Sequence, residues 1–286
     1  MEWSPMKRNI MTTWLITGCS TGLGRALAQA VLARGDNAVV TARDTSTLQD
    51  LATEFPTTAL AVALDVTEQS QVDAAVQQAE ERFGSVDVLV NNAGYGYRAA
   101  IEEGSDADVR TLFDTNVFGP VAMIKAVLPG MRSRRSGAIV NISSIGARIS
   151  PPGSGYYSAS KAALEGLSGS LQKEVKPLGI SVTVVEPGGF RTDFAGRSLT
   201  QSAGAIADYA DTAGKRRKEH DTVHGTQQGD PDKAAAAIIT AVEAPETPGF
   251  LLLGEDASKA YDAVAEAQRA EVDHWRELSI STGYTE

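Results

Sequence analysis

The sequence predicts an α/β fold in which a doubly wound, parallel, seven-stranded sheet is flanked by helices. From Thr12 onward, short apolar runs alternate with longer segments of helical period, which is the pattern of β-α-β units. A glycine-rich turn joins the first apolar run to the first helical segment. No linker rich in Gly, Ser or Pro divides the 286 residues, so we expect a single domain over residues 12–286.

Each apolar run is predicted to be one strand of this sheet, at residues 12–17, 37–42, 59–64, 86–91, 137–142, 180–185 and 249–253. The segments between them carry apolar residues at helical spacing and predict helices at 22–34, 46–54, 68–83, 106–133, 156–176, 231–243 and 256–279. The last helix places an apolar set near one face, so it should pack on the body or against another subunit: Tyr261, Val264, Val272, Trp275 and Leu278.

Two segments stand apart from this alternation. Residues 1–11 are interpreted as a leader or an alternative start, because Met1, Met6 and Met11 precede the first predicted strand. Residues 190–229 show no clean period, and a connection of that length in a compact domain is usually functional or disordered. We expect a substrate lid there. Its basic run Lys215–Lys218 is either a contact for an anionic group or a solvated helix face.

Composition argues against several classes of function. The formal net charge of −10 disfavours nucleic acid as a partner, because phosphate binding usually needs a basic face. No apolar run approaches the ~18 residues that span a bilayer, and the N-terminus lacks the apolar centre of a secretory signal, so we expect a cytoplasmic protein without a membrane partner. Cys19 is the only cysteine of the chain. Three histidines without a second cysteine make a metal site improbable.

The glycine-rich turn predicts a dinucleotide site. Glycines let the backbone turn sharply and approach a pyrophosphate, which would bind the free N–H groups at the start of the following helix. Cys19 in this turn is interpreted as a small packed residue rather than a reactive thiol. The residues expected to contact the cofactor here are Thr17, Gly18, Ser20, Thr21, Gly22, Leu23 and Gly24.

The end of the second strand distinguishes the two nicotinamide cofactors. An acidic residue there would bind the adenosine ribose, whereas a 2′-phosphate needs a cation. Ala42 stands where the acidic residue is expected and Arg43 follows, so we predict that NADP(H) is preferred over NAD(H). Asp44 leaves NAD(H) possible, although its side chain would point to the other side if the strand continues. Further strand ends should line the same cleft: Asp65, Val66, Asn92, Ala93 and Gly94.

Tyr157 and Lys161 are the candidate catalytic pair, because a separation of four residues brings both side chains onto one face of a helix. An ammonium roughly 4 Å from the phenol would contribute on the order of 4 kcal/mol and lower the tyrosine pKa from near 10 towards 7. Such a pair is also common on protein surfaces. Ser144, at the end of the fifth strand, favours the catalytic interpretation, because both hydroxyls could converge on one carbonyl oxygen.

Five motifs in this order resemble the short-chain dehydrogenase/reductase family. They are TGCSTGLG at 17–24, NNAG at 91–94, Asn116 within TNVFG, Ser144 with the Tyr157/Lys161 pair, and PGGFRT at 187–192. The resemblance extends from Thr12 to about Gly254 and implies a single-domain Rossmann fold. It also implies an oxidoreductase that acts on a carbonyl or alcohol group with a nicotinamide cofactor.

The resemblance assigns roles to individual positions. Tyr157 would be the general acid/base, Ser144 would hydrogen-bond the substrate oxygen, and Lys161 would bind the nicotinamide ribose and lower the tyrosine pKa. Asn116 would hold a water molecule that links Lys161 to solvent. Asp65 would contact the adenine and Asn91 would support the cofactor strand. The residues implied to hold the nicotinamide end are Pro187, Gly188, Phe190 and Thr192.

The segments expected to face the substrate are aromatic, small or aliphatic, which favours a lipophilic or aromatic ketone, aldehyde or secondary alcohol. Arg148 is either a clamp for a carboxylate or an exposed arginine. Two other functions stay open, a non-catalytic NADP-binding sensor and an epimerase-type enzyme for nucleotide sugars. Family members commonly form homodimers or homotetramers through the helices at 106–133 and 156–176. The predicted pocket residues are Tyr95, Tyr97, Ile145, Gly146, Pro151 and Phe194.

Overall fold

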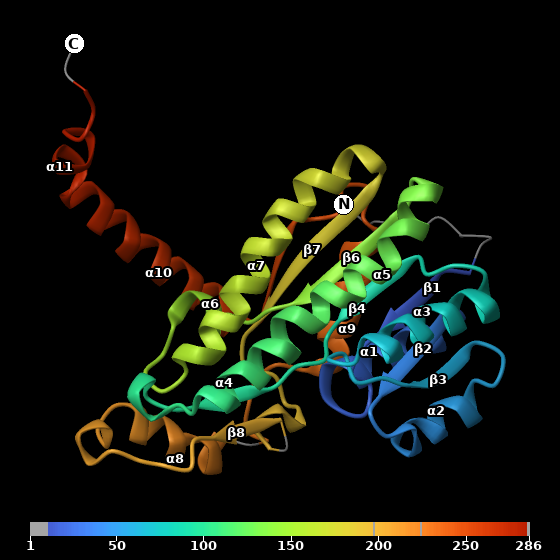
Figure 1. The fold of residues 1–286 in the computed structure, drawn as a ribbon, viewed down its shortest axis with the longest axis horizontal. Coiled ribbons are helices and arrows are strands. Elements are labelled where there is room, and N and C mark those ends of the chain that lie inside the picture. Colours follow the sequence, from blue (N-terminus) through green and yellow to red (C-terminus); the bar gives the residue numbers. More distant parts are fainter. Residues whose placement is uncertain (1–10, 197, 224, 285–286) are drawn as a thin grey trace.

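The computed structural model describes residues 11–196, 198–223 and 225–284, and its centre is a seven-stranded sheet (Figure 1). The strand order is β3-β2-β1-β4-β6-β7-β9, and every neighbouring pair is parallel. The doubly wound α/β fold predicted from the sequence is therefore confirmed. The strands are β1 (Thr13–Ile16), β2 (Asn37–Ala42), β3 (Ala59–Ala63), β4 (Val88–Asn91), β6 (Gly137–Ile142), β7 (Ile180–Pro187) and β9 (Phe250–Leu253).

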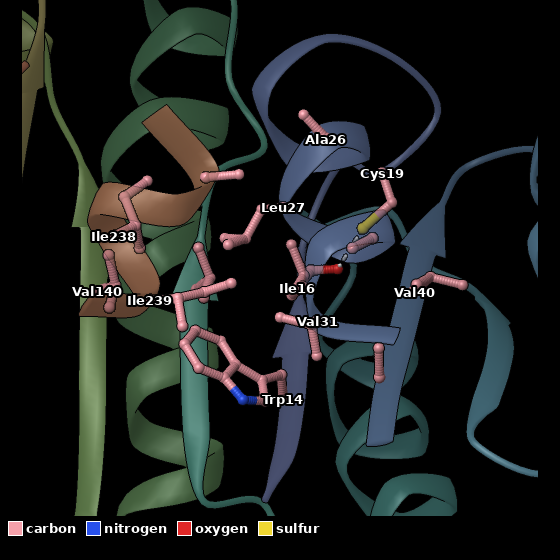
Figure 2. Close-up of a cluster of buried hydrophobic side chains, with 14 of the residues drawn as sticks. Trp14, Ile16, Cys19, Ala26, Leu27, Val31, Val40, Val140, Ile238 and Ile239 are labelled. Carbon is pink, nitrogen blue, oxygen red and sulfur yellow. Dashed lines mark hydrogen bonds between the residues drawn. The ribbon is translucent and has the colours of Figure 1, made fainter. Parts of the chain in front are cut away.

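Helices cover both faces of the sheet, because neighbouring strand residues point to opposite faces. Trp14 and Ile16 of β1 pack beneath α1 (Gly22–Ala33) and α9 (Pro231–Glu243), as Figure 2 shows. Leu15, between them, belongs to the opposite core. That core is covered by α3 (Gln69–Phe83), α5 (Gly119–Arg134) and the end of α7 (Gly155–Val175). The near-continuous apolar runs of the sequence are thus strands buried on both faces.

The order of the strands places a cleft at one edge of the sheet. β1 pairs with β2 on one side and with β4 on the other, so the chain reverses its winding direction between β1 and β4. Ligands of open α/β sheets bind outside the carboxyl ends of the strands at such a switch point. The loops that follow β1, β4, β6 and β7 meet there.

The helix predicted at 106–133 is interrupted. The structure has α4 (Asp106–Phe113), one turn of π-helix at Asp114–Phe118, and then α5. The predicted helix at 46–54 likewise begins as a 3-10 turn, Thr45–Leu48, followed by α2 (Gln49–Glu54). Periodicity could not find either break, because a π turn inserts one residue without changing the composition.

The predicted lid, 190–229, contains regular structure. It holds β8 (Leu199–Gln201), short 3-10 turns and α8 (Ala213–Val223). β8 pairs with β5 (Gly96–Arg98), which follows β4, and forms a separate two-stranded parallel sheet. A strand of three residues is too short to give a recognisable pattern in the sequence.

The C-terminal helix was expected to pack on the body or against another subunit. It is α10 (Glu255–His274) followed by α11 (Arg276–Ile280), and Figure 1 shows it running away from the body. Only its beginning packs, where Ala257 is buried and Tyr261 contacts Phe250. Val272, Trp275 and Leu278 are exposed, so the expectation that this face packs on the body is wrong for this part of the helix. Packing against another subunit stays a prediction.

In the described part of the chain, no helix combines the length and the apolar character that crossing a membrane requires. Residues 1–10, which include most of the predicted leader, lie outside the described residues.

Candidate active site

Two adjoining cavities open at the carboxyl edge of the sheet. One of about 210 Å³ is lined by Ser144, Tyr157 and Lys161, and the other, of about 560 Å³, is lined by Arg43 and Asp65. They share Thr21, Asn92, Gly94 and Ser198, so they form one elongated cleft. We name them the catalytic cavity and the nucleotide cavity. Three of the four predicted catalytic residues and most of the predicted cofactor residues thus line a single cleft, whereas Asn116, Thr17 and Gly24 line neither cavity.

The glycine-rich loop is shaped by its glycines and by Asn92. Gly18 and Gly22 have φ values of +73° and +64°, a region that residues with a side chain rarely adopt. A Cβ on Gly24 would collide with the Asn92 side chain and with the Gly18 carbonyl. The Asn92 amide donates to the carbonyls of Thr17 and Gly18 at 2.9 and 3.0 Å. The loop is therefore held open against the end of β4.

This loop fits the pyrophosphate of a dinucleotide. Helix α1 begins at Gly22, and its N-cap residue Thr21 makes no side-chain capping hydrogen bond. Thr21 and Gly22 line the cleft at this point. The first N–H groups of a helix have no partner within the helix, and the helix dipole favours an anion there. Gly18, Ser20, Thr21, Gly22 and Leu23 all line the cleft, whereas Thr17 and Gly24 support the loop from behind.

The end of β2 presents Arg43 to the nucleotide cavity. Ala42, Arg43, Asp65 and Val66 line the same wall. Asp44, the residue that left NAD(H) open, accepts a hydrogen bond from the Ser46 amide at 2.9 Å and caps the following 3-10 turn. The hydrogen bonds from Ser46 lower the pKa of Asp44. Asp44 is not among the described residues that line this cavity. Arg43 is therefore the charged residue at the end of β2 that reaches the cavity.

Tyr157 lies in the first turns of α7 and reaches the catalytic cavity. Burial raises the pKa of its phenol, while a hydrogen bond with Ser144 and the charge of Arg98 on β5 lower it. Its ring packs against Phe194, with the centroids 5.7 Å apart. The direction of the net shift is opposite to the one expected from Lys161 alone, because desolvation of the phenolate outweighs the nearby positive charge.

Lys161 is buried one helical turn after Tyr157. Its ammonium donates to the Ile142 carbonyl at 2.8 Å and lies 5.9 Å from the centroid of the Tyr157 ring. Burial lowers the pKa of Lys161 to about 8, and the carboxylate of Glu165 opposes this shift. The ammonium form of Lys161 therefore still predominates at neutral pH, with a smaller margin than in a free lysine.

Asn116 lies in the π turn between α4 and α5, fully buried. Its amide donates to the Tyr95 carbonyl and to the Ser160 hydroxyl, and its oxygen accepts from the Tyr95 amide. The π turn brings the Asn116 side chain to the loop after β4 and to α7, which carries Lys161. A π turn in this position is typical of functional sites.

The segment after β7 closes the catalytic cavity on the far side. Pro187, Gly188, Phe190 and Thr192 all line it. Asp256, at the start of α10, accepts a hydrogen bond from the Gly189 amide at 2.7 Å and leaves no room for a side chain at Gly188. Asp256 was not predicted, because it follows the other site residues by many positions and no local pattern marks it. Ser198 and Gln227, from the lid, also line the cavity and were not predicted.

The six predicted pocket residues separate into groups. Phe194 lines the catalytic cavity, whereas Tyr95 and Tyr97 line the nucleotide cavity. Tyr97 is buried and its hydroxyl donates to Asp108 at 3.1 Å. Gly146 donates to the Ser144 hydroxyl at 3.0 Å and so supports it. Neither cavity is lined by Ile145, Gly146 or Pro151.

Three residues with two possible roles find structural partners. Cys19 is buried, and burial raises the pKa of its thiol to about 12, which agrees with the packed interpretation. Arg148 is neither a clamp in the cavity nor a free arginine, because it pairs with Glu165 and Glu186. In the basic run, Arg217 forms an ion pair with Glu103 and donates a hydrogen bond to the Ser202 hydroxyl at 2.6 Å. We name the Arg217–Glu103 ion pair, which ties the lid to the rest of the domain, the latch.

Comparison with known proteins identifies relatives over most of the chain. Residues 12–203 match the family model described as short chain dehydrogenase. The oxidoreductase BOA17 of Botryotinia fuckeliana is 40% identical over 270 residues, which cover 94% of this chain and 98% of that protein. The 3-ketodihydrosphingosine reductase of Bacteroides thetaiotaomicron is 42% identical over 199 residues, 69% of this chain and 71% of that protein.

Solved structures show the same fold. A short-chain dehydrogenase from Streptomyces avermitilis has a TM-score of 0.90 and 43% identity, and the match covers 96% of this chain and 100% of that one. An alcohol dehydrogenase from Thermococcus sibiricus, complexed with 5-hydroxy-NADP, has a TM-score of 0.71 and 26% identity over 85% of this chain and 96% of that one. A 3-ketoacyl-(acyl-carrier-protein) reductase from Brucella melitensis, complexed with NADH, has a TM-score of 0.70 and 28% identity. The match covers 84% of this chain and 95% of that one.

Proposed function

The chain belongs to the short-chain dehydrogenase family of oxidoreductases, and from this premise we propose that it interconverts an alcohol and a ketone or aldehyde with NADP(H). Tyr157 is the general acid/base of this proposal. The observation that carries it is the catalytic cavity, in which Tyr157, Ser144 and Lys161 share one wall and Pro187, Gly188 and Thr192 line another. A substrate carbonyl bound between these walls would meet a proton donor.

The residues of this chain supply placement and proton transfer. NADP(H), when bound along the cleft, supplies the donor or acceptor of the hydride. Tyr157 gives its proton to the substrate oxygen during reduction and takes it back during oxidation. Ser144 hydrogen-bonds the same oxygen, and the Lys161 ammonium favours the ionised form of Tyr157. Phe194 against the Tyr157 ring and Phe190 along the wall exclude water from this end of the cleft.

Two features support NADP(H) as the preferred cofactor. Arg43 lines the nucleotide cavity, where a guanidinium can pair with a 2′-phosphate. Asp44 uses its carboxylate to cap its own 3-10 turn instead of facing the cavity. A carboxylate at the ribose is the feature that would favour NAD(H).

The lining of the catalytic cavity supports a lipophilic or aromatic substrate. Leu23, Ile142, Phe190 and Phe194 are apolar residues of its lining, and no Lys or Arg other than Lys161 lines it among the described residues. A carboxylate on the substrate would therefore find no second cation in this cavity. One relative is named for the reduction of 3-ketodihydrosphingosine, which is a ketone.

NADPH consumption against a panel of aromatic and aliphatic ketones and aldehydes tests the proposal. The wild-type protein should turn over at least one member, and Tyr157→Phe should lose activity by at least about a thousandfold, because removal of the acid/base leaves no proton donor at the substrate oxygen. Binding of NADPH, measured by its fluorescence, should be retained in the variant. Full turnover by Tyr157→Phe contradicts the assignment of this residue.

The same experiment separates the other two functions. A sensor would bind NADPH and show no turnover with any member of the panel. An epimerase-type enzyme would convert a nucleotide sugar without net consumption of NADPH. The Tyr157/Lys161 pair within one cavity favours catalysis, because a binding protein needs neither side chain.

We also propose that the protein is a homodimer or homotetramer. Leu167 on the outer face of α7 and Phe118 at the start of α5 are exposed. Apolar side chains on the surface of helices are typical of contacts between subunits. Light scattering should give two or four times the chain mass of 30.1 kDa, and a mass of one chain at micromolar concentration contradicts the proposal.

A further inference from the structure

Glu165 lies one helical turn after Lys161, and both side chains hold the end of strand β6. The Lys161 ammonium donates to the carbonyl of Ile142 at 2.8 Å. The Glu165 carboxylate accepts a hydrogen bond from the hydroxyl of Ser143, the next residue, at 2.6 Å. Residues four apart on a helix lie on the same face, so Glu165 and Lys161 extend from one face of α7 and bond consecutive residues at the end of β6.

Beside Glu165 is a cluster of two carboxylates and one guanidinium. Arg148, on the short helix α6 (Gly146–Ile149), lies 3.1 Å from Glu165 and 2.9 Å from Glu186. The side chains of Glu165 and Glu186 are 13% and 0% exposed and that of Arg148 is 40% exposed, so two largely buried carboxylates share one partly exposed guanidinium. One oxygen of Glu186 is buried and receives no hydrogen bond from any described residue.

Arg148 also ties this cluster to the C-terminal part of the chain. Its guanidinium lies over the rings of Phe250 in β9 and Tyr261 in α10, at 5.2 and 5.9 Å. A guanidinium held by two carboxylates and two rings has little freedom to move. The position of the Glu165 carboxylate beside Lys161 is therefore fixed by several elements at once.

We propose that Glu165 is a positioning residue for the reaction, whose carboxylate keeps Lys161 protonated inside the buried site. The inference rests on the proposed function for its catalytic meaning, but the charge of Lys161 can be measured without any substrate or cofactor. The Glu165 carboxylate, one turn along the same helix, is the negative charge that offsets part of the desolvation of the ammonium.

The direction of each pKa agrees with this assignment. Burial lowers the pKa of Lys161 to about 8, and Glu165 acts in the opposite direction. Burial raises the pKa of Glu186 to about 7, the Arg148 hydrogen bond lowers it, and the Glu165 carboxylate raises it. Arg98, on β5, acts on Tyr157 rather than on Lys161.

Titration of Lys161 in the full-length protein tests the proposal directly. The protein is labelled with lysine carrying ¹³C at Cε, and the NMR signal that disappears in Lys161→Met is followed with pH. Glu165→Gln should lower the Lys161 titration midpoint by about one pH unit, because a neighbouring negative charge is lost in a buried site. Glu174→Gln is the matched control, since Glu174 lies on the same helix but bonds the exposed Ser170. It should leave the midpoint unchanged.

Kinetics gives the second readout. Carbonyl reduction needs Tyr157 protonated and Lys161 charged, and Lys161 has the lower pKa of the two, so its deprotonation sets the alkaline limb of the pH profile. Glu165→Gln should move this limb towards acid by about the NMR shift and leave the rate at pH 6 within about twofold, because Lys161 is charged there in both proteins. Glu165→Asp, which keeps the charge, should restore most of the shift.

The variants are expected to fold, since loss of one carboxylate leaves a one-to-one pair of Arg148 with Glu186. If Glu165→Gln is insoluble, Glu165→Met serves the same titration. An unchanged Lys161 midpoint in the neutral variant overturns the proposal, as does a uniform loss of rate at every pH with no movement of the limb. If the wild-type protein turns over no substrate, the proposed function fails while the NMR titration still decides the role of Glu165.

Discussion

Single residues at the cleft derive their chemistry from neighbours far along the chain. Burial makes Tyr157 a weaker acid and Lys161 a weaker base than the free side chains, and both shifts work against a tyrosinate beside an ammonium. Ser144 and Arg98 act against the first shift and Glu165 against the second. A guanidinium on β5, a carboxylate on α7 and a hydroxyl that follows β6 thus oppose the effect of burial on the pair.

Arg43 gives a test of cofactor preference. Arg43→Ala should raise the KM for NADPH by about tenfold or more, because a charge-assisted pair with the 2′-phosphate is lost, and should change the KM for NADH by less than about twofold. Steady-state kinetics with both cofactors measures the two ratios. Arg25→Ala is the control, because Arg25 lies on α1 and pairs with Asp50 outside the cleft. Equal effects on NADPH and NADH at position 43 contradict the 2′-phosphate assignment.

Among the secondary-structure elements, the lid is held closed by a buried ion pair. Glu103, from the 3-10 turn at Ile101–Glu103, accepts hydrogen bonds from the amides of Ala100 and Ile206 at 2.8 and 2.7 Å. The same carboxylate pairs with Arg217 of α8, and their side chains are 3% and 14% exposed. Charges paired this deep cost several kcal/mol when one partner is removed. The lid is thus a latched element with its own interactions.

Opening this latch should weaken substrate binding more than cofactor binding. Glu103→Gln removes the charge from the pair and should raise the KM for the carbonyl substrate by about fivefold or more, while the Kd for NADPH changes by less than about twofold. It should also speed limited proteolysis within 198–223. Glu102→Gln is the control, because Glu102 bonds only the exposed Tyr209 hydroxyl at 2.7 Å among the described contacts. Proteolysis at the wild-type rate in Glu103→Gln contradicts the latch.

At the scale of the whole molecule, the C-terminal helix divides into a packed beginning and an exposed remainder. Asp256 holds the turn after β7 and Tyr261 packs on Phe250 and Arg148, so the first two turns of α10 belong to the domain. From residue 265 to residue 284 every side chain is exposed. Segments without buried contacts contribute little to the stability of a domain.

A chain that ends at Val264 should therefore unfold within about 4 °C of the full-length protein, which corresponds to roughly 1–2 kcal/mol for a domain of this size. A chain that ends at Gly254 loses Asp256 and Tyr261 and should unfold at a clearly lower temperature, because the turn at Gly188 and Gly189 loses its partner. Differential scanning fluorimetry measures both. A large loss of stability in the chain that ends at Val264 would show that the exposed part of the helix is covered in solution.

The sequence was sufficient for the parts of the site that are local in the chain. Thr17 to Gly24, the strand ends at Arg43, Asp65 and Asn92, and the Tyr157/Lys161 spacing were all predicted, because strand, turn and helix signals lie next to the chemistry. The seven strands were found within a few residues for the same reason. The π turn at Asn116 and the short strands β5 and β8 were missed, since neither changes the periodicity over a readable window.

The amino-acid sequence by itself determined the class of fold, the order of the strands along the chain and the identity of the candidate catalytic pair. Only the tertiary structure decided which distant groups act on that pair and which way each pKa moves, because desolvation and Coulomb interactions depend on distances between elements that the chain does not encode locally. It brought Arg98 near enough to act on Tyr157, Glu165 near enough to act on Lys161, and Asp256 to the turn after β7. It also separated Tyr95 and Tyr97 from Phe194, because two cavities share the one sheet edge.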